Sequence, residues 1–142
     1  LNLNTYNQII NSNSVCIHVR RKDYIGTGYE VVDVNYYQKA FNIIKSQFTN
    51  LNFFIFSDDI NWCKENLTFI PNSTFCSYTL LNDFHLMSLC NHFIIPNSTF
   101  SWWAAYLSNN NNKTVIIPSK WHKTNNNLLK DVSPENWIIQ KN

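Results

Sequence analysis

The sequence contains little charge, almost no glycine and no long apolar run. Charged residues are 14% of the 142 positions and the formal net charge is +2, too mild for a general nucleic-acid binder, which carries basic stripes or patches. No apolar run approaches the ~20 residues of a membrane-spanning helix. The polar start does not resemble a signal peptide. The only glycines, Gly26 and Gly28, lack the further glycine of a dinucleotide or phosphate-loop fingerprint and indicate a loop. We therefore expect neither nucleic acid nor a transmembrane segment.

Cysteine occurs at four positions that lie far apart in the sequence. Cys16, Cys63, Cys76 and Cys90 form no C-x-x-C pair, and no cysteine and histidine have the spacing of a zinc site. We interpret them as buried thiols of a protein in a reducing compartment, and we expect no metal.

What the sequence does contain is an alternation of β-rich and helical patterns. Hydrophobic residues make up 44% of the chain, enough for one ordinary domain with a core, so we treat 1–142 as a single domain. Strands are predicted at 14–19, 51–57, 74–79, 92–96 and 114–118, and helices at 34–48, 58–67, 83–90 and 98–109. The adjacent Trp102 and Trp103 are predicted to be core aromatics. This order predicts an α/β fold, a mostly parallel sheet with helices on both faces.

Polar residues gather where three of the predicted strands end. One cluster spans 18–23, a second spans 57–59 and a third spans 97–101. Ligands of parallel α/β sheets bind at the carboxyl ends of the strands, where loops and helix N-termini converge. The three clusters therefore predict one shared site at this end of the sheet.

The stretch HVRRKDY, residues 18–24, places two adjacent arginines at the end of a strand. Because side chains alternate between strand faces, His18 and Arg20 share one face and Arg21 lies on the other. An arginine fork matches phosphate or carboxylate oxygens, so one arginine could clamp a diphosphate while Asp23 orients it. The alternative is a surface arginine pair that Asp23 neutralises. His18 could be a core histidine or touch a base or ribose.

The later clusters have simpler explanations beside a functional one. Asp58 and Asp59 lack the D-x-D spacing of a metal site, and a helix follows at once, so Ser57 or Asp58 is expected as its cap. Asp83 heads another predicted helix, where a carboxylate compensates the N-terminal charge. Residues 97–99 lie between a strand and a helix, so they are expected to cap it, although the amides there also suit an anion.

Three segments together resemble a known enzyme family. They are HVRRKDY, FIFSDDINWCKENL and LNDFHLMSLCNHFIIPNSTFSWWAAYL, and their order and spacing agree over about 14 to 121. The chain is similar there to the donor-binding half of the α-1,2-fucosyltransferases, glycosyltransferase family 11. The resemblance implies a GDP-fucose donor, a galactoside acceptor, inversion at the sugar carbon, no required metal or other cofactor, and a GT-B architecture whose C-terminal Rossmann-like half binds the nucleotide.

The resemblance also implies roles for individual residues. Arg20 would bind the β-phosphate and stabilise the charge of the departing GDP, Arg21 would support the same region, and His18 would approach the nucleoside. Asp23 is a guess for the inverting base. Asp83 would contact guanine. The remaining residues implied in the nucleotide pocket are Ser57, Asp58, Asp59, Asn97, Ser98, Thr99 and Ser101.

The sequence departs from the family in two ways. Lys22 stands where the family usually has glycine, which adds bulk at a loop that can use glycine's backbone freedom. Family members also carry about another half, the acceptor side, ahead of the arginine motif, whereas 17 residues precede His18 here. Two alternatives to a working transferase domain therefore remain open, a non-catalytic nucleotide-sugar-binding remnant and a glycan-binding module.

We expect a cytoplasmic location, with any membrane association made through a further region. The cytoplasmic expectation rests on one observation. Asn97 begins an N-x-T/S glycosylation sequon, and a glycan there would occupy the predicted donor site. If the site is real, that sequon is unused, which agrees with a cytoplasmic protein.

Overall fold

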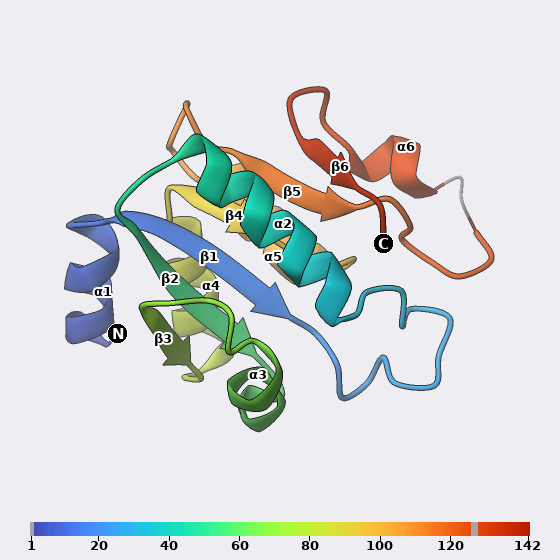
Figure 1. Ribbon diagram of the computed structural model, residues 1–142, viewed down its shortest axis with the longest axis horizontal. Coiled ribbons are helices and arrows are strands. Elements are labelled where there is room, and N and C mark those ends of the chain that lie inside the picture. The colour runs from blue at the N-terminus through green and yellow to red at the C-terminus, as the bar shows by residue number, and fades with distance from the viewer. Residues whose placement is uncertain (1, 126–127) are drawn as a thin grey trace.

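A six-stranded parallel sheet forms the centre of the protein (Figure 1). The computed structural model describes residues 2–125 and 128–142. The strand order is β3-β2-β1-β4-β5-β6, and every neighbouring pair is parallel. The strands are β1 (Asn13–Val19), β2 (Leu51–Ser57), β3 (Ser73–Cys76), β4 (His92–Ile94), β5 (Val115–Pro118) and β6 (Ile138–Gln140). This is the strand order of a doubly wound, Rossmann-like fold, and it confirms the predicted α/β class.

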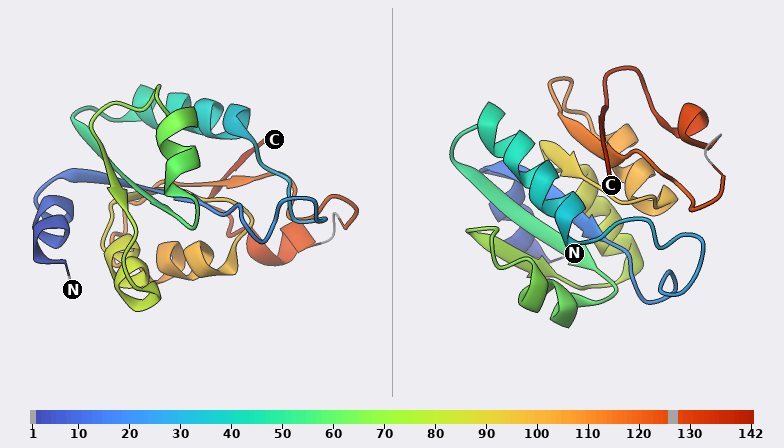
Figure 2. Two further views of the ribbon diagram at one scale, coloured as in Figure 1. Left: turned by 90° about the horizontal axis from the view of Figure 1, so that it is seen from below. Right: turned by 45° about the vertical axis from the view of Figure 1, so that its right-hand side comes forward.

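Helices cover both faces of this sheet (Figure 2). On one face lie α2 (Val34–Gln47) and α3 (Ile60–Asn66). On the other lie α1 (Leu3–Ile10), α4 (Leu80–Ser88), α5 (Thr99–Leu107) and the short α6 (Leu128–Val132). Two hydrophobic clusters, one on each face, fill the space between helices and sheet. With both faces covered, β1 is buried from Ser14 to Val19, as expected for a central parallel strand.

Helix α2 illustrates how the sequence pattern becomes structure. Asp33 caps it, its side chain accepting a hydrogen bond from the Tyr36 amide. Tyr37, Phe41 and Ile44 lie at helical spacing, and all three are buried against the sheet. The prediction of a helix at 34–48 is confirmed to within one residue.

Several local predictions were wrong in detail. Asp59, and neither Ser57 nor Asp58, caps α3. Helix α4 begins at Leu80 with Thr79 as its cap, so Asp83 lies in its first turn and does not head it. Trp103, expected in the core, is 49% exposed. Helices α1 and α6 and strand β6 were not predicted. The prediction of four buried free thiols is confirmed, and burial raises the pKa of Cys16, Cys63 and Cys76.

The strand order creates one special position along the sheet. From β1 the chain continues to β2 on one side, whereas β4, its other neighbour, continues to β5 in the opposite direction. Loops that leave adjacent strands in opposite directions open a crevice at the carboxyl ends, where ligands of such folds bind. The loop 20–33 and the start of α5 lie at this point.

Candidate functional site

Residues from all three predicted clusters meet at the carboxyl end of the sheet. They surround a hollow of about 210 Å³, which we call the rim pocket. Its lining residues are His18, Arg20, Phe56, Ser57, Asp58, Ser77, Tyr78, Leu80, Asp83 and Phe100. Five of these were predicted as site residues. Of the other five, Phe56 and Phe100 lie inside the quoted motif segments but were not predicted as site residues, and Ser77, Tyr78 and Leu80 lie between those segments.

His18 forms the floor of the rim pocket and is 4% exposed. Its Nδ1 lies 2.9 Å from the Ser101 hydroxyl, and its carbonyl accepts a hydrogen bond from the Tyr37 hydroxyl. Burial, with a smaller contribution from the charge of Arg20, lowers the pKa of His18 to about 3. The imidazole is therefore neutral at physiological pH and offers hydrogen bonds without charge.

Arg20 lies at the mouth of the same pocket and is held by a carboxylate. Its Nε and Nη2 donate to the two oxygens of Asp23 at 2.8 and 2.7 Å, a bidentate pair. The hydrogen bonds from Arg20 lower the pKa of Asp23, so this carboxylate is charged and a weak base. The guanidinium is about one-third exposed, and its remaining N–H groups are not used by this pair. Arg20 is thus oriented and still able to bind an anion.

Arg21 lies on the opposite side of the rim. Its guanidinium carbon stacks 4.1 Å above the Trp62 ring, and its Nε lies 3.5 Å from a carboxylate oxygen of Asp59. Arg21 and Trp62 line a separate hollow over α2 and α3. The strand alternation predicted from the sequence is confirmed, because only Arg20 shares a pocket with His18.

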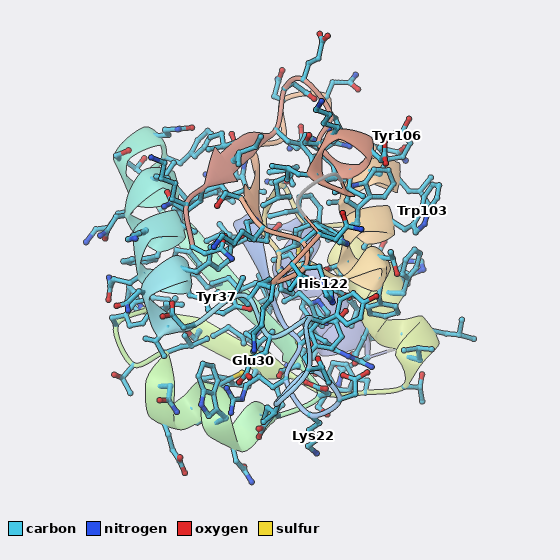
Figure 3. All side chains as sticks on the ribbon, turned by 90° about the vertical axis from the view of Figure 1, so that its right-hand side faces the viewer. Lys22, Glu30, Tyr37, Trp103, Tyr106 and His122 are labelled. Atoms are coloured by element: carbon cyan, nitrogen blue, oxygen red, sulfur yellow. The ribbon has the colours of Figure 1, made fainter. Side chains whose placement is uncertain are left out.

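Asp58, at the end of β2, binds the backbone of Arg21 and Lys22, which we call the arginine turn. Its two oxygens accept from the backbone amides of Arg21 and Lys22 at 3.0 and 3.1 Å, and Oδ2 lies 3.6 Å from the Arg20 Nε. Lys22 points outward into solvent (Figure 3). Among the described residues, the non-glycine positions with positive φ are Asn50 and Asn72. The backbone at Lys22 therefore does not require glycine.

Asp83 reaches the rim pocket from the first turn of α4. Its carboxylate accepts from the Tyr78 amide at 3.1 and 3.3 Å. Burial raises the pKa of Asp83, while the Tyr78 hydrogen bond opposes that shift. Phe100 lines the pocket too, and its ring lies 5.8 Å from that of His18. This part of the pocket combines an acceptor with aromatic walls, which suits a planar ring bearing N–H donors.

The polar cluster between β4 and α5 divides between two locations. Ser101 reaches His18, as described, whereas Asn97 is 1% exposed and donates to the carbonyls of Tyr29 and Trp121 at 3.0 and 2.8 Å. Asn97 thereby ties the loops 20–33 and 119–125 together. Ser98 caps α5 without a side-chain hydrogen bond, and Thr99 is exposed. The first amides of α5 point toward the carboxyl end, as helix N-termini do.

The same loops are packed together by Gly28. A Cβ at this position would lie 2.1 Å from Nε2 of His122, so any larger residue would have to displace the His122 ring. The amide of Lys123 donates to the Gly28 carbonyl at 2.8 Å, and Tyr29 packs edge-on against His122. Trp121 and His122 were missed in the sequence because no motif marks the segment after β5.

The pocket at the crevice suits an aromatic base linked to an anion. It combines a buried neutral histidine, an oriented arginine, a carboxylate acceptor and aromatic walls.

Among residues 2–125 and 128–142, no group of three or more His, Cys, Asp or Glu side chains gathers to hold a metal ion. In the same residues, no helix has the length and apolar character to cross a membrane.

The model of glycosyl transferase family 11 matches residues 1–141. The chain belongs to this family.

Two relatives come from Escherichia coli. The chain is 33% identical to the O-antigen biosynthesis glycosyltransferase WbnK over 96% of this chain and 48% of WbnK. It is 35% identical to an alpha-1,2-colitosyltransferase over 89% of this chain and 47% of the relative. Mouse galactoside alpha-(1,2)-fucosyltransferase 2 is 33% identical over 68% of this chain and 31% of that protein. This family 11 chain thus spans about half the length or less of the curated relatives it matches.

Solved structures agree in fold. NodZ alpha-1,6-fucosyltransferase co-crystallized with GDP superposes with a TM-score of 0.52 at 16% sequence identity, covering 72% of this chain and 38% of NodZ. A NodZ crystal soaked with GDP-fucose gives a TM-score of 0.51. At this identity, the likeness supports the Rossmann-like α/β fold of the family 11 chain.

Proposed function

We propose that this chain is the donor-binding domain of an inverting fucosyltransferase that transfers L-fucose from GDP-fucose to a galactoside in α-1,2 linkage. The observation that carries the proposal is the rim pocket, which joins Arg20, His18 and Asp83 at the crevice of the sheet. Family membership and the α-(1,2)-fucosyltransferase relatives support the reaction class.

Arg20 is the proposed ligand of the diphosphate. Departure of GDP moves negative charge onto the β-phosphate, and a fixed guanidinium stabilises that charge without reorganising during the reaction. Asp23 holds two of the Arg20 N–H groups, so the remaining face of the fork is presented in one orientation. We assign Asp23 this orienting role, because its low pKa and its use of both oxygens make it a poor general base.

The nucleoside is proposed to lie deeper in the rim pocket. The Asp83 carboxylate would accept from the adjacent N1–H and 2-amino groups of guanine, and the neutral His18 would hydrogen-bond the nucleoside from the floor. Ser57 and Asp58 would line the entrance, with Ser101 holding the imidazole. Thr99, Ser98 and the first amides of α5 would contribute donors to the phosphates.

The remaining proposed residues act from behind the pocket. Arg21 and Asp59 would support the arginine turn from the Trp62 side, and Asn97 would hold the loops that frame it. We further propose that donor binding needs no metal, that residues 1–142 form one domain, that a further domain supplies the acceptor contacts, and that the enzyme is cytoplasmic.

A second donor sugar is favoured by one relative. The alpha-1,2-colitosyltransferase is 35% identical over 89% of the chain, so transfer of a colitosyl group is the alternative within the same linkage class. Competition between GDP-fucose and other nucleotide-linked sugars for the chain would separate the two.

The proposal is tested by calorimetric titration of the chain with GDP and with ADP, in buffer containing a chelator. We expect GDP to bind and ADP to bind at least about tenfold more weakly, because adenine offers an acceptor where guanine offers the N1–H donor. Equal binding of both nucleotides, or no binding of either to the folded chain, would contradict the proposed donor site. Dependence on added Mg²⁺ would contradict the metal-free part.

A further inference from the structure

Tyr78, outside every recognised motif, connects the rim pocket to a distant helix. Its ring lines the pocket, and its amide donates to both oxygens of Asp83. Its hydroxyl lies 2.8 Å from the hydroxyl of Thr5 on α1. Tyr78 is therefore held at its amide by the Asp83 carboxylate and at its hydroxyl by Thr5, which lies 73 positions earlier in the sequence.

The Thr5 end of this connection is rigid. Thr5 is 2% exposed, and its amide donates to the Asn2 side chain that caps α1. Ile9 anchors the same helix in the core, where it is 1% exposed. Helices α1 and α4 lie on the same face of the sheet (Figure 2). Helix α1 can therefore support the turn before α4, which carries Tyr78. A hydroxyl held in this way can restrict a neighbouring ring to one position.

Within the turn 77–79, Thr79 is held by α4 as its cap, whereas Ser77 and Tyr78 have little else to hold them. Ser77 and Thr79 are exposed, and Tyr78 itself is 37% exposed. Strand β3 ends at Cys76, and the hydrogen bonds of α4 begin at Thr79, whose carbonyl accepts from the Asp83 amide at 2.9 Å, so Ser77 and Tyr78 lie between the sheet and the first helical bond. The Asp83 carboxylate and the Thr5 hydroxyl are the two side-chain partners recorded for Tyr78.

Resting on the proposed donor site, we propose that the Thr5–Tyr78 hydroxyl pair is a positioning device for guanine selectivity. It fixes Tyr78, and through the Tyr78 amide it fixes Asp83, in the orientation that accepts from both donors on the guanine edge. Thr5 and Tyr78 are positioning residues in this scheme, and Asp83 makes the contact with the base. Loss of either hydroxyl should blur the distinction between bases more than it weakens binding of the diphosphate.

The test compares GDP with inosine diphosphate, which keeps N1–H and lacks the 2-amino group. The ratio of their dissociation constants isolates the contact at that amino group, since everything else in the two ligands is shared. In Thr5→Val and in Tyr78→Phe, we expect GDP affinity to fall about three- to tenfold and affinity for inosine diphosphate to change less, so that the ratio approaches one. The double variant should be no worse than either single one, because both remove the same bond.

Two matched variants control for loss of a hydroxyl elsewhere. Tyr106→Phe removes the hydroxyl of a tyrosine that is 52% exposed, stacks on Trp102 and points away from the rim (Figure 3). It should leave both affinities unchanged. Thr5→Ser keeps the hydroxyl and should retain most of the selectivity, whereas a role in packing alone would leave Thr5→Val like wild type and make Thr5→Ser, which loses the methyl group, the weaker variant.

The possible failures are distinguishable. If the wild-type chain does not bind GDP, the proposed donor site is wrong and this inference falls with it. If wild type prefers GDP over inosine diphosphate and the Thr5→Val and Tyr78→Phe variants keep that preference, the donor site stands and the positioning role is overturned. The positioning role is also overturned if both affinities fall equally, since the pair would then support only the fold. If Thr5→Val does not fold, the ratio for Tyr78→Phe decides the question.

Discussion

The two ends of the sheet differ in shape and in chemistry. A hollow of about 600 Å³ lies at the amino end, whereas the carboxyl end has the rim pocket of about 210 Å³ and, beside it, the Arg21–Trp62 hollow of about 560 Å³. The amino-end hollow is lined by apolar rings and asparagines, and Lys45 is the one charged residue among its described lining residues. Arg20, Asp58 and Asp83 converge on the smaller pocket. Convergent charge, and not volume, therefore marks the functional end.

The difference follows from the topology of parallel sheets. Each helix that follows a strand begins at the carboxyl end, so its free amides and capping residues gather there. At the amino end, chains return through the ends of helices and tight turns, such as the turn at Asn72 with its positive φ. If this contrast is functional, changes at the two ends should have separable effects.

The largest expected effect comes from removing a cation at each end. Arg20→Ala should lower GDP affinity about a hundredfold, or ~3 kcal/mol, because a charge-assisted contact with the diphosphate is lost and Asp23 is left unpaired. Lys45→Ala removes a cation that lies 5.6 Å from the Phe41 ring, and it should not change GDP affinity. Calorimetry on the two variants measures the contrast. Comparable losses in both would show that GDP senses only overall charge.

The next effect concerns acid sensitivity, since a buried histidine lies at each end. The pKa of His18 is lowered to about 3, and burial also lowers the pKa of His92, whose ring stacks on Phe48 at the amino end. As pH falls below ~6.5, His18 becomes protonated in the unfolded chain but stays neutral in the folded protein, so the free energy of unfolding falls. The loss from His18 should reach ~2 kcal/mol by pH 5.

Urea unfolding between pH 7 and pH 5 measures this loss. In His18→Asn, the fall in stability across that range should be mostly removed, whereas His92→Asn should flatten it less. A wild-type protein whose stability is constant from pH 6.5 to 5 would contradict the buried neutral state of His18. Equal flattening in both variants would erase the difference between the ends.

Strand and helix periodicity was enough to predict the core of the fold. The apolar runs at 14–19 and 51–57 became β1 and β2, and the strand alternation separated Arg20 from Arg21. Local capping was less predictable, because Ser57, Asp58 and Asp59 are all good caps and tertiary contacts decide among them. Asp58 is taken by the amides of the arginine turn, which leaves Asp59 for α3.

Other elements and contacts could not be predicted from the local sequence pattern alone. Strand β6 has three residues and exists through pairing with β5, which local sequence does not reveal. Helix α1 had a weak signal, a capping Asn2 and inward positions Thr5 and Ile9 at helical spacing, inside an asparagine-rich stretch. The pairing of Thr5 with Tyr78 depends entirely on tertiary structure, so no motif could have indicated it.

A smaller effect is expected for Asp83, with an exposed carboxylate outside the rim pocket as its control. Asp83→Asn should lower GDP affinity about tenfold and reduce the preference for GDP over ADP, because an amide offers only one acceptor oxygen to the guanine edge. Glu65→Gln, in the last turn of α3 on the exposed surface, should leave both affinities unchanged. Competition titrations with the two nucleotides give the preference directly. An unchanged GDP-to-ADP ratio in Asp83→Asn would remove Asp83 from base recognition.

The smallest expected effect uses two buried serines near opposite ends of α5. Ser101 lies 2.9 Å from His18 at the rim, and Ser108 donates to the Cys90 carbonyl at 3.3 Å at the other end. Both are buried, so each change to alanine should cost about 1 kcal/mol of stability. Only Ser101→Ala should also weaken GDP binding, about two- to fivefold, because the His18 ring loses the hydroxyl that orients it. Paired unfolding and binding measurements separate the two effects. If Ser108→Ala weakened GDP binding as much, affinity would follow the stability of the whole helix, and the carboxyl end would lose its special role.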